Sequence, residues 1–94
     1  MAYHLLAEFS EEPNWGYLHA RSTVKLPSIE FFPLSNPPAL GISIPRHRTE
    51  EIRSLDLKEF LLELAARGAS IYDLYTGEAV TRDDIDRVIH QIFN

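Results

Sequence analysis

The sequence predicts an α+β two-layer sandwich, in which two C-terminal amphipathic helices cover one face of a three- to four-stranded, mainly antiparallel sheet. Residues 3–9 alternate between apolar and polar side chains, which is typical of a half-buried strand. Two similar helix-start signals, at residues 55–60 and 80–85, each precede apolar residues at helical spacing. With 94 residues, the chain is long enough for one hydrophobic core, so we expect a single domain over residues 1–94.

An N-terminal β-hairpin is expected to begin the sheet. The strand at residues 3–9 places four apolar side chains on one face: Tyr3, Leu5, Ala7 and Phe9. A turn at residues 11–14 leads to a second extended segment at residues 15–26. If Ser10 pairs with Trp15, one face of the hairpin is mostly apolar and the other mostly polar. The polar face then collects five side chains, namely His4, Glu8, Tyr17, His19 and Arg21.

The middle of the chain contains four prolines, at Pro27, Pro33, Pro37 and Pro38. Because proline disfavours both helices and central strands, residues 27–38 are predicted to be irregular. Residues 40–44 and 70–75 are predicted strands, and residues 79–80 a short returning strand. The polar segment at residues 46–54 is expected to form a loop or a short helical turn.

The first helix-start signal predicts a helix at residues 57–67. Asp56 is the expected capping residue, and Glu59 follows three residues later, as in a capping box. Leu55 and Phe60 flank the box as a hydrophobic staple. The predicted apolar stripe of this helix consists of Leu57, Phe60, Leu61, Leu64 and Ala65.

The second signal predicts a helix at residues 82–93. Thr81 is the expected cap, Asp84 takes the position usually held by Glu, and Val80 and Ile85 form the staple. The predicted apolar stripe consists of Ile85, Val88, Ile89, Ile92 and Phe93.

Composition excludes several classes of function. The chain has no cysteine, which excludes disulfides, thiolate metal sites and a cysteine nucleophile. The net charge of −5 opposes non-specific nucleic-acid binding and favours basic partners. No apolar stretch approaches the ~20 residues of a membrane span, and no signal peptide is recognisable, so we expect a cytoplasmic protein without membrane contact.

The residue types favour a small, acidic, non-enzymatic protein–protein interaction module, such as an inhibitor, immunity or accessory protein of the kind carried by phages or plasmids. Tryptophan, tyrosine and arginine, which anchor interfaces, recur in the segment after residue 14. Phe31 and Phe32 form an apolar run that can dock a partner or a second copy of the chain, and Arg46 and Arg48 form a local positive spot. The expected partner-binding residues are Trp15, Tyr17, His19, Arg21, Phe31, Phe32, Arg46 and Arg48.

Two alternatives remain open at this stage. A small nuclease-like or other hydrolytic enzyme would use a histidine–carboxylate pair and an arginine from the polar hairpin face: His4, Glu8, His19 and Arg21. A nucleic-acid binder would use Arg46, Arg48 and Arg53. No cofactor or metal is expected, because His4 and Glu8 would lie about 13 Å apart along one strand.

Part of the C-terminal region carries the pattern Ile71-Tyr72-Asp73, Thr76-Gly77, Val80-Thr81 and Asp83-Asp84-Ile85. This pattern resembles the hairpin-plus-helix element of polyhydroxyalkanoate accumulation regulators, and the resemblance implies a strand–turn–strand–helix unit. In that family the element is expected to be basic for binding DNA. Here Arg82 and Arg87 stand against five acids, Asp73, Glu78, Asp83, Asp84 and Asp86, so DNA binding is not extended to this chain.

Overall fold

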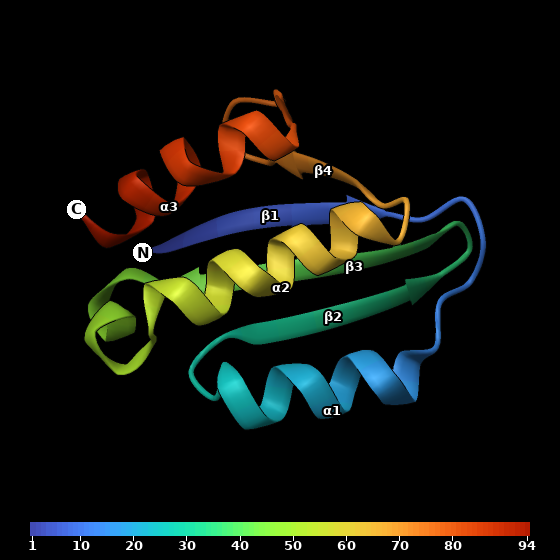
Figure 1. The fold of residues 1–94 in the computed structure, drawn as a ribbon, viewed down its shortest axis with the longest axis horizontal. Coiled ribbons are helices and arrows are strands. Elements are labelled where there is room, and N and C mark those ends of the chain that lie inside the picture. The colour runs from blue at the N-terminus through green and yellow to red at the C-terminus, as the bar shows by residue number, and fades with distance from the viewer.

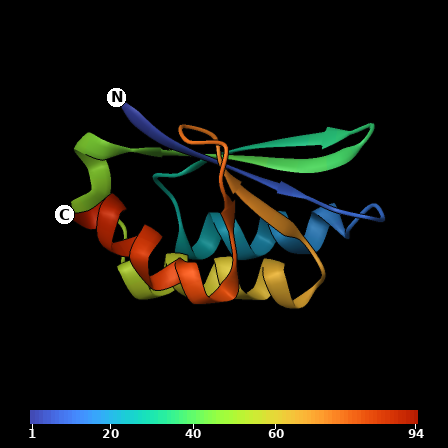
Figure 2. The ribbon, with the colours of Figure 1, turned by 90° about the horizontal axis from the view of Figure 1, so that it is seen from above.

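A five-stranded antiparallel sheet forms one layer of the structure and three helices form the other (Figures 1 and 2). The computed structural model describes all 94 residues. The strands are Ala2–Glu8 (β1), Glu30–Ser35 (β2), Pro38–Pro45 (β3), Ser70–Asp73 (β4) and Ala79–Val80 (β5). The α-helices are Trp15–Lys25 (α1), Ser54–Ala66 (α2) and Ile85–Phe93 (α3), and two short 3-10 helices are Arg46–Glu51 (η1) and Arg82–Asp84 (η2).

The strand order is β2-β3-β1-β4-β5, and every neighbouring pair is antiparallel. β3 therefore lies between β1 and β2, which run parallel to each other. The first six main elements follow the order β-α-β-β-α-β, which is a split β-α-β arrangement of ferredoxin-like topology. β5 and α3 extend this unit at the β4 edge. The α+β class is confirmed, but the sheet has five strands rather than three or four.

The core lies between the sheet and the helices. The predicted alternation of β1 is confirmed, since Tyr3, Leu5, Ala7 and Phe9 are all buried. The predicted helical stripes are confirmed at their centres, where the buried residues are Leu57, Phe60, Leu61, Leu64, Ile85, Val88 and Ile92. Ala65, Ile89 and Phe93 are partly buried and pack against this core.

The N-terminal β-hairpin is wrong, because residues 15–25 form α1 and not a strand. Asn14 caps this helix, and its Oδ1 accepts a hydrogen bond of 3.0 Å from the Tyr17 backbone N–H. Leu18, Ser22 and Leu26 are buried at intervals of four residues, which is a helical period and not a strand period. β1 instead pairs with β3 and β4.

The proline-rich segment is also more ordered than expected. β2 occupies residues 30–35, inside the segment predicted to be irregular, and pairs with β3 as a hairpin. β2 is an edge strand, and an edge strand tolerates Pro33 because only one side of its backbone is paired.

The two helix starts behave differently. The capping box of Thr81 and Asp84 is confirmed, with both of its reciprocal hydrogen bonds present. The capping role of Asp56 is wrong, because α2 already begins at Ser54 and has no side-chain cap. Asp56 lies in the first turn, where it pairs with Arg53 at 3.8 Å and suits the positive end of the helix dipole.

Candidate functional site

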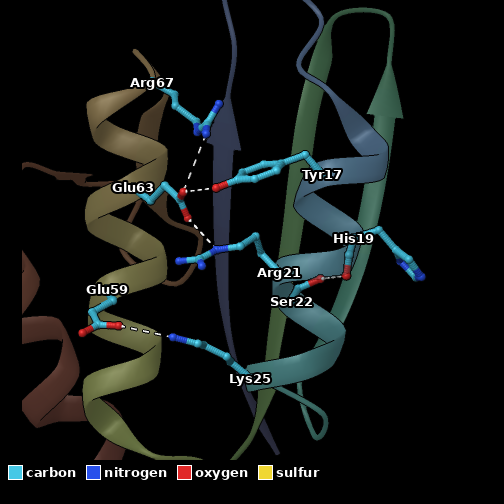
Figure 3. Close-up of polar contacts among 8 residues, drawn as sticks. All are labelled: Tyr17, His19, Arg21, Ser22, Lys25, Glu59, Glu63 and Arg67. Carbon is cyan, nitrogen blue, oxygen red and sulfur yellow. Dashed lines mark hydrogen bonds and ion pairs between the residues drawn. The ribbon is translucent and has the colours of Figure 1, made fainter.

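Helix α1 presents two different faces to the rest of the molecule. Tyr17 and Arg21, one helical turn apart, point toward α2, whereas His19 points away from it (Figure 3). Trp15 and His19, again one turn apart, line a cavity against β2. The strand interpretation places Tyr17, His19 and Arg21 on one face of a hairpin. The helical period instead separates His19 from Tyr17 and Arg21 and brings it to the same side as Trp15.

The α2-facing side of α1 is held by a shared carboxylate (Figure 3). Glu63 Oε1 accepts a hydrogen bond of 2.7 Å from the Tyr17 hydroxyl, and Glu63 Oε2 lies 3.2 Å from Arg21 Nε. Arg67 approaches the same carboxylate at 3.7 Å and places its guanidinium 4.5 Å from the centre of the Tyr17 ring. One α2 residue therefore fixes two α1 residues, and Arg67 adds a cation–π contact.

These contacts lower the pKa of Glu63. The hydrogen bond from Tyr17 is the main cause, and the charges of Arg21 and Arg67 add to it, against a partial burial that acts in the opposite direction. A separate ion pair joins Lys25 Nζ and Glu59 Oε2 at 3.8 Å. Polar side chains thus join α1 to α2, in addition to the core packing of Leu18 and Leu26.

The other side of α1 forms one wall of an apolar groove of about 370 Å³. The opposite wall consists of Phe31 and Pro33 from β2, together with Leu40 from β3. The residues contributed by α1 are Trp15, Gly16, Leu18, His19 and Ser22. Because β2 is an edge strand, this groove lies beside backbone groups that have no strand partner.

The groove contains few polar groups. The Ser22 hydroxyl already donates to the His19 backbone oxygen at 3.0 Å, so it is satisfied within the helix. His19 is exposed and is the one ionisable side chain in the lining. Trp15 is held in place by Glu12, whose Oε1 accepts from the indole N–H at 2.9 Å, and by an edge-to-face contact with Phe9. The groove is therefore a mainly apolar surface in which the aromatic side chain of Trp15 is held by two contacts.

The polar cluster expected for hydrolysis does not form. His4 and Glu8 are exposed on β1, on the sheet face opposite to its buried apolar side chains. His19 and Arg21 belong to α1, in the helical layer (Figure 2). The two groups are separated because residues 15–25 form a helix rather than the second strand of a hairpin. His4 and Glu8 therefore lie on one side of the sheet, and His19 and Arg21 lie on the other.

Phe31 and Phe32 point to opposite faces of β2. Phe31 packs edge-to-face on Phe60 of α2, with ring centroids 5.5 Å apart, and forms part of the groove wall. Phe32 lies on the other face and is 52% exposed. Phe31 therefore contributes to the core and the groove, whereas Phe32 is exposed. This follows from the strand geometry, in which successive side chains point to opposite faces.

The arginines of the local positive spot have separate surroundings. Arg46 begins η1 and places its guanidinium 5.6 Å from the centre of the Tyr3 ring. Arg48 is exposed within η1. Arg53 pairs with Asp56, so part of its charge is compensated.

Sequence reasoning missed a buried polar cluster around Asp73. The Tyr3 hydroxyl donates a short hydrogen bond to Asp73 Oδ2 and also contacts Gln91 Oε1 at 3.1 Å. Asp73 Oδ1 accepts from the backbone N–H groups of Tyr75 at 2.8 Å and Thr76 at 3.3 Å. The cluster joins β1, the β4–β5 turn and α3, and the signal for it was the aspartate at the end of a strand before a turn.

The environment shifts both ionisable groups of this cluster. Burial raises the pKa of Tyr3 to about 12, and the hydrogen bond and charge of Asp73 contribute in the same direction. Burial also disfavours charge on Asp73, but the hydrogen bonds from Tyr3, Tyr75 and Thr76 outweigh it and lower the pKa of Asp73. Because its pKa is lower than the ordinary value, the fold is more stable with Asp73 charged than with Asp73 protonated.

Comparisons with models of protein families, with curated proteins and with solved structures found no significant match. No three His, Cys, Asp or Glu side chains lie close enough together to hold a metal ion. None of the helices combines the length and apolar character that crossing a bilayer requires.

Proposed function

We propose that this chain is a non-enzymatic protein–protein interaction module, of the inhibitor, immunity or accessory kind, and that it binds a segment of another protein in the groove between α1 and β2. The observation that carries this proposal is the groove itself. It measures about 370 Å³, its walls are almost entirely apolar, and its one ionisable lining residue, His19, has no carboxylate partner there. The groove thus lacks the histidine–carboxylate pair expected of a hydrolytic site, whereas its shape and apolar area suit the binding of a large apolar side chain.

The groove favours an extended segment. β2 offers an unpaired strand edge beside it, and a segment that adds to such an edge gains main-chain hydrogen bonds while alternate side chains enter the adjacent pocket. Trp15, Phe31 and Leu40 then provide the apolar contacts for one large side chain of the partner.

Charge complementarity indicates a basic segment. No lysine or arginine lines the groove, whereas the exposed residue Glu12 lies beside it and accepts a hydrogen bond from Trp15. The whole chain also carries a net charge of −5. The preferred ligand therefore combines a large apolar side chain with neighbouring lysine or arginine residues.

The test is selection of random short peptides for binding to the full chain, followed by measurement of the selected peptides on two matched variants. Ser22→Leu fills the groove from the α1 side without removing any hydrogen bond beyond its own turn. Thr23→Leu is the control, because Thr23 also bonds to the His19 backbone oxygen but does not line the groove.

We expect the selected peptides to share a large apolar residue with flanking basic residues. Ser22→Leu should weaken their binding at least tenfold, and Thr23→Leu should leave it unchanged. Failure to select any such peptide, or equal loss of binding in both variants, would contradict the groove as the site.

A further inference from the structure

The face of the sheet opposite to the helices has no covering layer (Figure 2). The strand registers define a row across all five strands on this face, composed of Phe32, Gly41, Leu6, Tyr72 and Ala79. None of these side chains carries a charge. On a sheet face that is only solvated, the outward positions are usually polar, so this row is the unusual feature of the face.

Two large apolar side chains on the β2 part of this face are open to solvent. Phe32, which belongs to the row, is 52% exposed, and Leu34, two residues further along β2 on the same face, is 51% exposed. Phe32 lies over Gly41, where an added Cβ would come within 3.4 Å of the Phe32 Cβ. Because Gly41 has no side chain, the ring of Phe32 has room to lie against the neighbouring strand.

Two ionisable side chains flank the row in a symmetric way. His4 and Glu8 lie two residues before and two residues after Leu6 on β1, and both are exposed. Glu30 is a further acid on this face, on β2. None of the strand residues that point out of this face is a lysine or an arginine.

We propose that a second copy of this chain covers the open sheet face, with the two-fold axis parallel to the apolar row. In this arrangement Leu6 stacks on Leu6 of the other copy. His4 of each copy faces Glu8 of the other, so the dimer contains two equivalent histidine–carboxylate contacts. The strands of the two sheets stay aligned, which is a common packing of stacked sheets at a spacing of about 10 Å.

The dimensions of the molecule are sufficient for such a dimer. The molecule measures 33 × 27 × 22 Å, and its two layers are stacked along the shortest axis, so the open face is a broad one. A standard interface buries roughly 800 Å² on each partner, which a face of this extent can supply.

The direction of the axis follows from charge. An axis parallel to the strands would also stack the rows, but it would place Glu8 opposite Glu8 and His4 opposite His4. Like charges that face each other across an interface destabilise it. The axis parallel to the row avoids this repulsion and pairs unlike groups instead.

The first measurement is the mass of the full chain by sedimentation over a range of concentrations. We expect a dimer that dissociates on dilution, and we expect Leu6→Glu to convert it to a folded monomer. Since Leu6 is half-buried, circular dichroism and thermal unfolding should show that the variant remains folded. A chain that stays monomeric at millimolar concentration would overturn the proposal.

Charge variants test the orientation without changing the apolar row. His4→Glu places two acids opposite each other and should raise the dissociation constant about tenfold. The double variant His4→Glu with Glu8→Lys should restore the affinity of the original chain to within a few-fold. With the other axis the double variant would bring like charges together, so lack of restoration would overturn the proposed arrangement.

The variant Ser22→Leu distinguishes dimerisation through the sheet face from peptide binding in the groove. It should leave the dimer unchanged, because Ser22 lies in the helical layer. A dimer that is lost in Ser22→Leu but kept in Leu6→Glu would place the self-association in the groove and overturn the sheet-face proposal.

Discussion

Tyr3 and Asp73 depend on each other for their protonation states. Asp73 is buried and charged because Tyr3 and the backbone of the following turn donate hydrogen bonds to it. Tyr3 is held neutral by the same burial and by the neighbouring charge. The period of β1 correctly predicts that Tyr3 points into the core, but no local pattern indicates its partner, which lies 70 residues away along the chain.

The raised pKa of Tyr3 has a consequence at alkaline pH. The phenol titrates at about 10 in the unfolded chain and at about 12 in the folded one, so its contribution to stability is complete below pH 10 and is lost between pH 10 and 12. We expect the free energy of unfolding to fall by about 1–3 kcal/mol over this range. Urea unfolding at a series of pH values measures it.

Two variants complete this test. Tyr3→Phe should cost about 1.5–3 kcal/mol at neutral pH, because a charged hydrogen bond to a buried carboxylate is lost, and it should remove the alkaline decline. Tyr75→Phe changes an exposed tyrosine and should retain the decline. Equal alkaline losses in the original chain and in Tyr3→Phe would show that Tyr3 is not responsible.

At the scale of the element, the sequence pattern of α1 explains why Tyr17, His19 and Arg21 were predicted to lie on one face of a strand. Its aromatic and polar residues satisfy a two-residue alternation over Trp15–Arg21, and only Leu18, Ser22 and Leu26 reveal the helical period. Because one of these three is a serine, the apolar stripe is incomplete. By contrast, α2 and α3 have full stripes, and their positions followed from sequence.

The polar attachment of α1 predicts a local change in stability. Glu63→Gln keeps an acceptor for Tyr17 but removes the charge that Arg21 and Arg67 share. We expect the global free energy of unfolding to change by less than about 1 kcal/mol, because such pairs near the surface are weak. The backbone amides of α1 should nevertheless exchange with solvent faster than before, which hydrogen exchange measures.

The matched control is Glu59→Gln, which removes a single, longer ion pair to Lys25. It should change exchange in α1 less than Glu63→Gln does. The lowered pKa of Glu63 adds a pH test, since its contribution is complete above the ordinary range of a glutamate and is lost as the pH falls through the lowered value. Identical exchange in the two variants would contradict a special role for Glu63.

At the scale of the whole molecule, sequence predicted the two layers but not the order of the strands. Alternation and helical stripes report which face of an element is buried, and this information sufficed for β1, α2 and α3. Strand pairing depends on contacts between distant segments, and β1 pairs with strands that begin at residues 38 and 70 rather than with its neighbour in sequence. The open face and the groove both follow from that pairing, so neither was accessible to local patterns.

A single core joins the two layers, and this has a testable consequence. Leu64 of α2 is fully buried within the one hydrophobic cluster, whereas Leu55 on the same helix is 52% exposed. Leu64→Ala should therefore cost about 2–5 kcal/mol, and Leu55→Ala less than about 0.5 kcal/mol. Urea unfolding followed by both tryptophan fluorescence and circular dichroism should give one coincident transition for each variant, because Trp15 packs against the same core as α2 and α3. If fluorescence and circular dichroism gave separate transitions, α1 and the groove would unfold independently of the sheet, and the core would not act as one unit.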